Sequence, residues 1–226
     1  MVINGGWFRT QAGNLVFIEK WDLGIFHPPC TYLTCSAEWA YKDPDYVRYP
    51  GVGYHQKLKP GTLFGAARRQ AREEALQFVC DLLNAPIEKK AVENPVGVIS
   101  TRIFWYIGGE NGPARYEVFP RKTIGIQPQV IQPHWFGEDT SKATAMYLVR
   151  LPKLKPTKHF PPRIVNGKKR WGNQTDSGQS NLTPSDDRAK ERSKTLPGPA
   201  MAFAKQWGKI NCQAQPHQGI MKTNVG

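Results

Sequence analysis

The stretch Trp21–Ser36, which reads WDLGIFHPPCTYLTCS, decides how the chain is organised. A short apolar run, Leu23–Phe26, is followed by His27, by two prolines and by Cys30. Apolar residues bounded by turn residues are typical of a buried strand, and paired prolines cannot continue a strand ladder. Cys30 is therefore predicted at the carboxyl end of a strand, where ligands bind in open α/β sheets. Cys30 alone favours the alternative of a buried structural cysteine.

A second predicted strand ends in a similar way, within Ala91–Gly97 (AVENPVG). Its apolar residues are followed by Glu93, Asn94 and Pro95. A carboxylate therefore stands at the end of this strand, and a thiol stands after the end of the first strand. A nucleophile and a carboxylate at two strand ends form a candidate catalytic pair. The alternative for Glu93 is a solvated loop carboxylate or a helix cap.

A helix is predicted between these two strands, over Thr62–Asn84. Thr62 is a suitable N-cap, and the dipeptide after Asn84 contains a proline that ends the helix. The apolar stripe comprises Leu63, Ala67, Ala71, Ala75, Phe78, Val79, Leu82 and Leu83. The outer, solvated face is expected to carry Arg68, Arg69, Arg72, Glu73 and Glu74. A strand–helix–strand crossover makes the strands parallel, so we expect Cys30 and Glu93 at one sheet edge.

The two strand ends resemble the catalytic motifs of cytosine-5 DNA methyltransferases, in which PPC is followed by an ENP-type tripeptide. The strings HPPCTYLT, ENPVG, QPHWFGEDTSKAT and PSDDR…ERSKTLPGPAMAFAKQWG together are similar to the compact, mostly phage-encoded members. The resemblance spans Trp21 to Gly208 and implies an α/β fold with a Rossmann-like methyltransferase sheet. It implies one domain over residues 1–208, N-terminally incomplete and with loop and hairpin insertions, and a loose tail over 209–226.

The resemblance also implies roles for individual residues. Cys30 would add to carbon 6 of cytosine, and Glu93 would hydrogen-bond the base while Asn94 shapes the turn. The active-site loop would comprise His27, Pro28, Pro29, Tyr32 and Pro95. S-adenosylmethionine would donate the methyl group, in a pocket lined by the last helix at Pro197 and Gly198.

The family's first strand, glycine turn and helix, which would hold part of the cofactor, find no room in Met1–Lys20. We therefore weigh three explanations: an N-terminal truncation, a second chain that supplies the cofactor half, and a DNA-binding relative that does not methylate.

The charge balance indicates DNA as the partner. The 226 residues carry a formal net charge of +13, with a sequence pI near 9.7, and such an excess favours a polyanion. We expect nucleic-acid contacts from Lys142, Arg163, Lys168, Lys169, Arg170 and Trp171. Most of these lie in a basic, recognition-like loop over residues 152–185, for which the alternative is a flexible solvated loop.

Two further segments are predicted as insertions. Residues 34–61 form a loop rich in aromatic and turn residues, either a lid over the site or a small satellite core. Residues 101–129 form a β-hairpin, because Asn111-Gly112 favours a tight turn between two β-rich arms.

The cysteines and the hydropathy exclude several classes of protein. Four cysteines (Cys30, Cys35, Cys80 and Cys212) are too few and too irregularly spaced for a disulfide framework, and their spacing argues against a metal site. Met1–Trp7 lacks the features of a signal peptide, and no apolar run is long enough to span a bilayer. We expect a cytoplasmic protein, in the host cytoplasm if it is phage-encoded, without a membrane partner.

Overall fold

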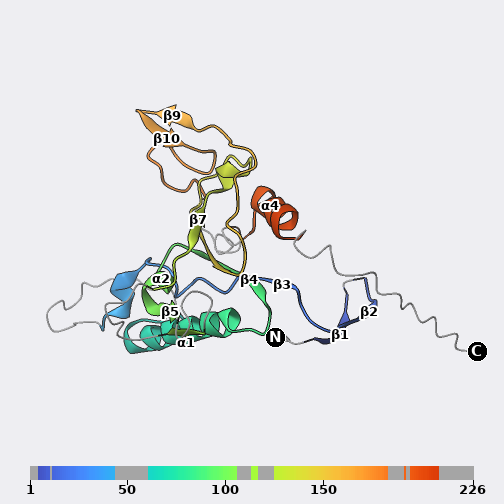
Figure 1. The fold of residues 1–226 in the computed structure, drawn as a ribbon. Coiled ribbons are helices and arrows are strands. Elements are labelled where there is room, and N and C mark those ends of the chain that lie inside the picture. The colour runs from blue at the N-terminus through green and yellow to red at the C-terminus, as the bar shows by residue number, and fades with distance from the viewer. Residues whose placement is uncertain are drawn as a thin grey trace, which may run out of the picture.

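The computed structural model describes residues 5–10, 12–43, 61–105, 113–116, 125–182, 191 and 194–208. Its centre is a mixed four-stranded sheet in the order β3-β4-β8-β7 (Figure 1). The strands are β3 (Leu23–Phe26), β4 (Lys89–Pro95), β8 (Thr144–Val149) and β7 (Gln129–Ile131). β3 and β4 are parallel, whereas β8 runs antiparallel to both of its neighbours. The predicted α/β class and the parallel arrangement of the two strands are confirmed.

Two helices cover the two faces of this sheet. α1 (Gly65–Leu83) buries Leu76, Val79 and Leu83 against a core that includes Val92 of β4 and Tyr147 of β8. α4 (Pro197–Trp207) packs on the other core, which includes Ala91 of β4, Met146 of β8 and Phe203. Successive residues of a strand point to opposite faces, which is why Ala91 and Val92 belong to different cores.

The prediction for α1 was wrong in three respects, one of which is that Leu63, Ala67 and Phe78 of the predicted apolar stripe are exposed. The helix begins at Gly65, after Phe64 as N-cap residue, and not at Thr62. Arg68 and Arg72, predicted on the solvated face, are buried with exposed fractions of 7% and 9%. The reason is that the segment before the helix folds back over them and supplies aromatic rings and carbonyl oxygens, as described below.

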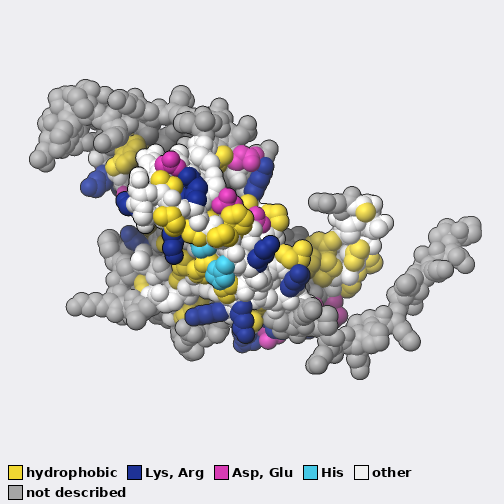
Figure 2. All heavy atoms as spheres, turned by 90° about the horizontal axis from the view of Figure 1, so that it is seen from above, with side chains coloured by type: hydrophobic (Ala, Val, Ile, Leu, Met, Phe, Trp, Pro, Cys, Tyr) yellow, Lys and Arg dark blue, Asp and Glu magenta, His cyan; other side chains and the backbone are white. Residues whose placement is uncertain are grey.

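A second group of elements lies beyond the far end of the sheet. η3 (Pro133–Trp135) follows β7, and β9 (Arg163–Val165) pairs antiparallel with β10 (Lys168–Arg170). Figure 2 views this end of the molecule from above and shows histidine side chains beside apolar ones, with Lys and Arg side chains around them. The basic segment therefore contains a β-hairpin, which the sequence analysis did not predict.

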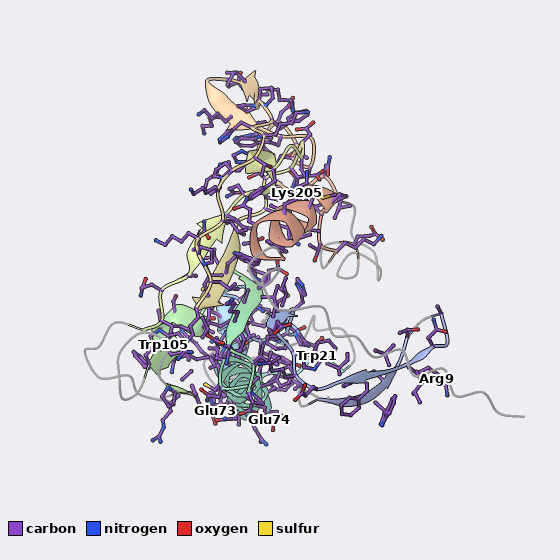
Figure 3. The ribbon with its side chains drawn as sticks, turned by 45° about the vertical axis from the view of Figure 1, so that its right-hand side comes forward. Arg9, Trp21, Glu73, Glu74, Trp105 and Lys205 are labelled. Atoms are coloured by element: carbon purple, nitrogen blue, oxygen red, sulfur yellow. The ribbon has the colours of Figure 1, made fainter. Side chains whose placement is uncertain are left out.

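The N-terminal segment forms a hairpin of its own, separate from the main sheet (Figure 3). β1 (Gly6–Arg9) pairs antiparallel with β2 (Leu15–Ile18), and Phe8 packs edge-on against Trp21. Its other face exposes Trp7 and Phe17, with exposed fractions of 68% and 56%. These residues contribute no strand to the central sheet.

The remaining elements are short. α2 (Ile99–Arg102) leads into β5 (Ile103–Trp105), which pairs antiparallel with β6 (Ala114–Tyr116), so the arms of the predicted hairpin are confirmed. Its Asn-Gly turn, most of the aromatic loop (residues 44–60) and the predicted tail lie outside the described residues. Among the described helices, none is both long and apolar enough to cross a bilayer.

Candidate functional site

The carboxyl ends of β3 and β4 are joined by two side-chain contacts. His27 Nδ1 lies 2.5 Å from Glu93 Oε2, and Asn94 Nδ2 donates to the carbonyl oxygen of Pro28 at 3.2 Å. The parallel register pairs Phe26 with Val92, so the residues that follow them in β3 and β4 emerge at the same edge of the sheet. The structure thus brings His27, Pro28, Glu93 and Asn94 to one edge of the sheet, where the sequence predicted them.

Asn94 is buried, with an exposed fraction of 1%. Because Nδ2 must face the Pro28 carbonyl, the orientation of the amide is fixed and Oδ1 points the other way. Oδ1 is buried and has no hydrogen-bond partner among the described residues. A buried polar atom without a hydrogen-bond partner lowers the stability of the fold. We therefore assign Asn94 to holding the β3–β4 junction and not to stabilising the core.

Cys30 lies half-buried at the start of the turn that follows the prolines. Its carbonyl accepts from the Leu33 amide at 3.0 Å, and the Leu33 carbonyl accepts from the Val98 amide at 2.9 Å. Gly97 allows this approach, because a Cβ there would lie 2.0 Å from the Leu33 oxygen. The chain after Cys30 is therefore tied to the chain after Pro95.

Arg72 of α1 fixes this loop from the opposite side. Its guanidinium donates to the carbonyl oxygens of Tyr32 (2.9 Å) and Thr34 (3.2 Å) and pairs with Glu38 at 2.6 Å. The guanidinium carbon also lies 3.4 Å from the centroid of the Tyr41 ring. The sequence analysis did not predict this role for Arg72, because nothing in the helix sequence distinguishes an arginine that clamps the loop from one that is solvated.

Two aromatic residues, Tyr32 and Tyr41, contribute to this clamp. Tyr41 is buried, and its hydroxyl donates to the Tyr32 carbonyl at 3.2 Å. Arg68 lies over both rings, at 4.8 Å from the Tyr41 centroid and 5.4 Å from that of Tyr32. The described part of the aromatic loop is thus a small satellite core, one of the two predicted alternatives.

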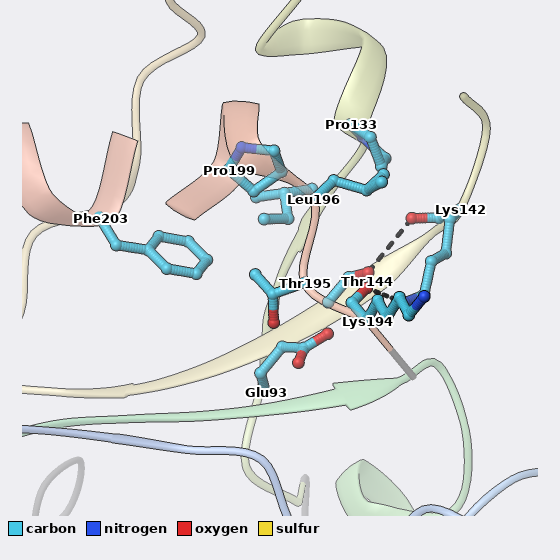
Figure 4. A pocket seen from close by; sticks show the side chains of 10 residues that line it. Glu93, Pro133, Lys142, Thr144, Lys194, Thr195, Leu196, Pro199 and Phe203 are labelled. Carbon is cyan, nitrogen blue, oxygen red and sulfur yellow. Dashed lines mark hydrogen bonds between the residues drawn. The ribbon is translucent and has the colours of Figure 1, made fainter. Parts of the chain in front are cut away.

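A hollow of about 320 Å³, counting space open to solvent, lies between β4, β7, β8 and the start of α4 (Figure 4). Glu93 and Lys142, predicted on separate grounds, both line it, and Lys142 Nζ donates to the Lys194 carbonyl at 3.4 Å. Cys30 is not among the lining residues. The others are Ile131, Pro133, Thr144, Lys194, Thr195, Leu196, Pro199 and Phe203.

The two residues predicted to hold a cofactor lie in the first turn of α4 but do not line the hollow. The Gly198 amide donates to Glu138 Oε1 at 2.6 Å. A Cβ on Gly198 would lie 2.4 Å from the Phe136 carbonyl oxygen. Pro197 and Gly198 therefore pack the helix start against the segment after η3, while their neighbours Leu196 and Pro199 face the hollow.

The predicted nucleic-acid residues of the basic segment divide into two groups. Arg163 pairs with Asp176 at 2.5 Å, and Arg170 donates to the Asp176 carbonyl at 3.0 Å, so both arginines hold the loop after Trp171. Lys168 and Lys169 are exposed. The lysines therefore remain candidates for phosphate contacts, whereas the arginines have structural partners.

Trp171 connects this hairpin to the body of the protein. Its ring stacks on His134 with centroids 4.2 Å apart. Burial lowers the pKa of His134, and His159 and Lys169 add to that effect. The Gly172 amide donates to Asp139 Oδ1 at 2.7 Å.

The cysteines differ in their availability for chemistry. Burial raises the pKa of Cys80 to about 12, which keeps that thiol protonated. Cys35 is exposed and Cys30 is half-buried, whereas Cys212 lies outside the described residues. Within the ranges the structure describes, no three His, Cys, Asp or Glu residues are grouped so as to hold a metal ion.

The chain was compared with protein families, with curated proteins and with solved structures, and none of them matches it.

Proposed function

We propose that the chain is a cytosine-directed DNA-modifying protein of the cytosine-5 methyltransferase type, with a Rossmann-like sheet. The observation that carries this proposal is the junction of β3 and β4, where contacts from Glu93 and Asn94 hold the loop that presents Cys30. A thiol and a carboxylate held at neighbouring parallel strand ends are the groups that nucleophilic attack on a pyrimidine requires.

The proposed reaction begins with addition of the Cys30 thiolate to carbon 6 of the cytosine ring. The electron pair of the 5,6 double bond moves to carbon 5, and the ring nitrogen near Glu93 shares the developing charge. Carbon 5 then takes a proton from water and loses its original hydrogen to water as a proton. Departure of the thiolate restores the double bond, so hydrogen exchange at carbon 5 needs no co-reactant.

His27 gives Glu93 a defined orientation in this scheme. The imidazole engages Oε2, which leaves Oε1 for the hydrogen bond to the base. Lys142 and Thr144 bring further polar groups to the same hollow, and Phe203, Leu196 and Pro199 give it apolar walls.

The described residues do not form a complete seat for S-adenosylmethionine. The Gly198 amide at the start of α4 already donates to Glu138. β1 and β2 form a separate hairpin that does not line the hollow. No step of the proposed reaction therefore depends on the cofactor.

The test uses DNA that carries tritium at carbon 5 of its cytosines, with release of tritium into water as the readout. The wild-type protein should release tritium without any cofactor, Cys30→Ser should not, and the matched variant Cys35→Ser should behave as wild type. Release that is equally fast with Cys30→Ser would contradict the proposal, as would no release from either single-stranded or duplex DNA.

A DNA-binding relative without chemistry is the second candidate, and the incomplete cofactor seat favours it. This function predicts DNA binding that weakens steeply with salt and is unchanged in Cys30→Ser. Binding of that kind, together with no release of tritium, would select this second function over the first.

A further inference from the structure

The β9–β10 hairpin is a rigid projection. Its two-residue turn consists of Asn166 and Gly167 with φ of 49° and 73°, the positive values that favour a tight hairpin turn with the correct twist. The register pairs Lys168 with Val165, Lys169 with Ile164, and Arg170 with Arg163. A turn and ladder of this kind fix the position of each side chain.

The two faces of the hairpin serve different purposes. Arg163 and Arg170 are paired across the strands, and both bind the loop around Asp176. Lys168 lies on the same face and is exposed. Ile164 and Lys169 occupy the other face, and Ile164 has an exposed fraction of 64%. Antiparallel ribbons normally turn their apolar side chains toward the protein, so an exposed isoleucine here does not contribute to packing.

The surroundings of Ile164 are strongly basic. Residues 150–182 contain eight Lys and Arg residues and a single acidic residue, Asp176. That carboxylate is neutralised by Arg163, so the exposed lysines dominate the local field. Figure 2 shows apolar and basic side chains together on this end of the molecule. An apolar side chain surrounded by cations suits nucleic acid better than an apolar protein surface.

The segment that follows the hairpin contacts residues next to the hollow that contains Glu93. Trp171 follows β10 and stacks on His134 of η3, whose neighbour Pro133 lines the hollow. Asn173 accepts from the Ser141 amide and donates to its carbonyl, both at 2.9 Å. Ser141 precedes Lys142, another residue of the hollow, so the segment after β10 is held by two contacts to residues next to the lining.

We infer that the β9–β10 hairpin inserts Ile164 between bases of duplex DNA at the step beside the reactive cytosine, while Lys168 and Lys169 contact the phosphates. This inference rests on the proposed function, which requires the base to leave the stack. Apolar side chains that enter a base step unstack it and kink the duplex. Ile164 thus lowers the cost of extruding the cytosine and does not act on the ring itself.

The experiment measures base unstacking in the Cys30→Ser background, so that it does not depend on the thiol. Duplexes with cytosines in varied sequence contexts carry 2-aminopurine beside each cytosine, and a second set has an abasic site opposite the cytosine. Binding of the parent protein to matched duplexes should raise the 2-aminopurine fluorescence. With Ile164→Ala the rise should be lost on matched duplexes but should still occur on duplexes that carry the abasic site. Leu15→Ala, which alters another exposed hairpin residue, is the control and should behave as its parent.

The lysines are tested by the salt dependence of binding. Lys168→Ala with Lys169→Ala should weaken binding and lower the slope of log K against log salt by about 2, whereas Lys205→Ala on α4 should not. An unchanged fluorescence rise in Ile164→Ala would overturn the inference, as would an absence of binding to duplex DNA. The inference would also fail if Ile164→Ala reduced the fluorescence rise equally on single-stranded DNA. Because no thiol chemistry is measured, failure here is distinct from failure to release tritium.

Discussion

Asn94 donates through Nδ2 to the carbonyl oxygen of Pro28 at 3.2 Å, although the two residues are 66 positions apart in the chain. The contact is buried and connects the carboxyl end of β4 to the proline turn that precedes Cys30. A backbone carbonyl is held by a side chain here because proline has no amide hydrogen with which to extend the ladder. The position of the proposed nucleophile therefore depends on a residue of the neighbouring strand.

We predict that Asn94→Ala lowers the free energy of unfolding by about 1–3 kcal/mol, because the Pro28 carbonyl then loses its partner in a buried site. The Cys30 loop should also loosen, so that Cys30 reacts faster with a thiol reagent. Denaturant unfolding and the labelling rate of Cys30 measure the two effects. If both values equal those of the wild type, Asn94 does not hold the loop.

Arg72 provides a second prediction about the same loop. Arg72→Lys keeps the charge but cannot reach two carbonyls and Glu38 together, so we expect a loss of about 2–4 kcal/mol in the free energy of unfolding. Arg150→Lys, in an exposed pair with Glu88, should cost at most about 1 kcal/mol. Denaturant titrations of both variants make the comparison, and equal losses would contradict the clamp.

The thiols should differ in reactivity in the native protein. Cys35 is exposed and should react first, Cys30 should follow, and Cys80, whose pKa burial raises to about 12, should react only after unfolding. Mass spectrometry of peptides after timed alkylation gives the order. Labelling of Cys80 before Cys30 under native conditions would be inconsistent with the described packing.

The His134–Trp171 stack predicts a pH dependence of stability. Burial, with His159 and Lys169, lowers the pKa of His134 below its ordinary value of 6.5. The unfolded chain then binds the proton more readily than the native one, so the free energy of unfolding falls as the pH drops below 6.5, whereas above it both forms are neutral. His134→Phe keeps a stacked ring and should weaken this dependence in denaturant titrations at pH 7.5 and 5.5. An unchanged slope would assign the effect to other groups.

Local sequence signals were sufficient for the elements that position the site. The apolar run before the prolines gives β3, and helical periodicity followed by Ala85-Pro86 gives α1, so the parallel pair could be predicted. The Asn166-Gly167 pair is an equally local signal for the β9–β10 hairpin, which the sequence analysis interpreted only as a basic loop. The Lys- and Arg-rich composition of the segment led to its interpretation as a loop, although the Asn-Gly dipeptide alone predicts a hairpin turn.

The features that escaped prediction depend on distant residues. Arg72 is buried because Tyr32, Glu38 and Tyr41 come from another segment to meet it. Glu93 and Lys142 share a hollow because the antiparallel pairing of β8 brings them together. Neither arrangement leaves a pattern within a single element, so sequence periodicity could not reveal it.

The most direct test of the proposed chemistry is the release of tritium from carbon 5 of cytosine in DNA, compared between the wild type and Cys30→Ser. We expect release by the wild type in the absence of any cofactor and only background release by Cys30→Ser. Equal release by the two proteins would show that Cys30 is not the nucleophile and would contradict the account.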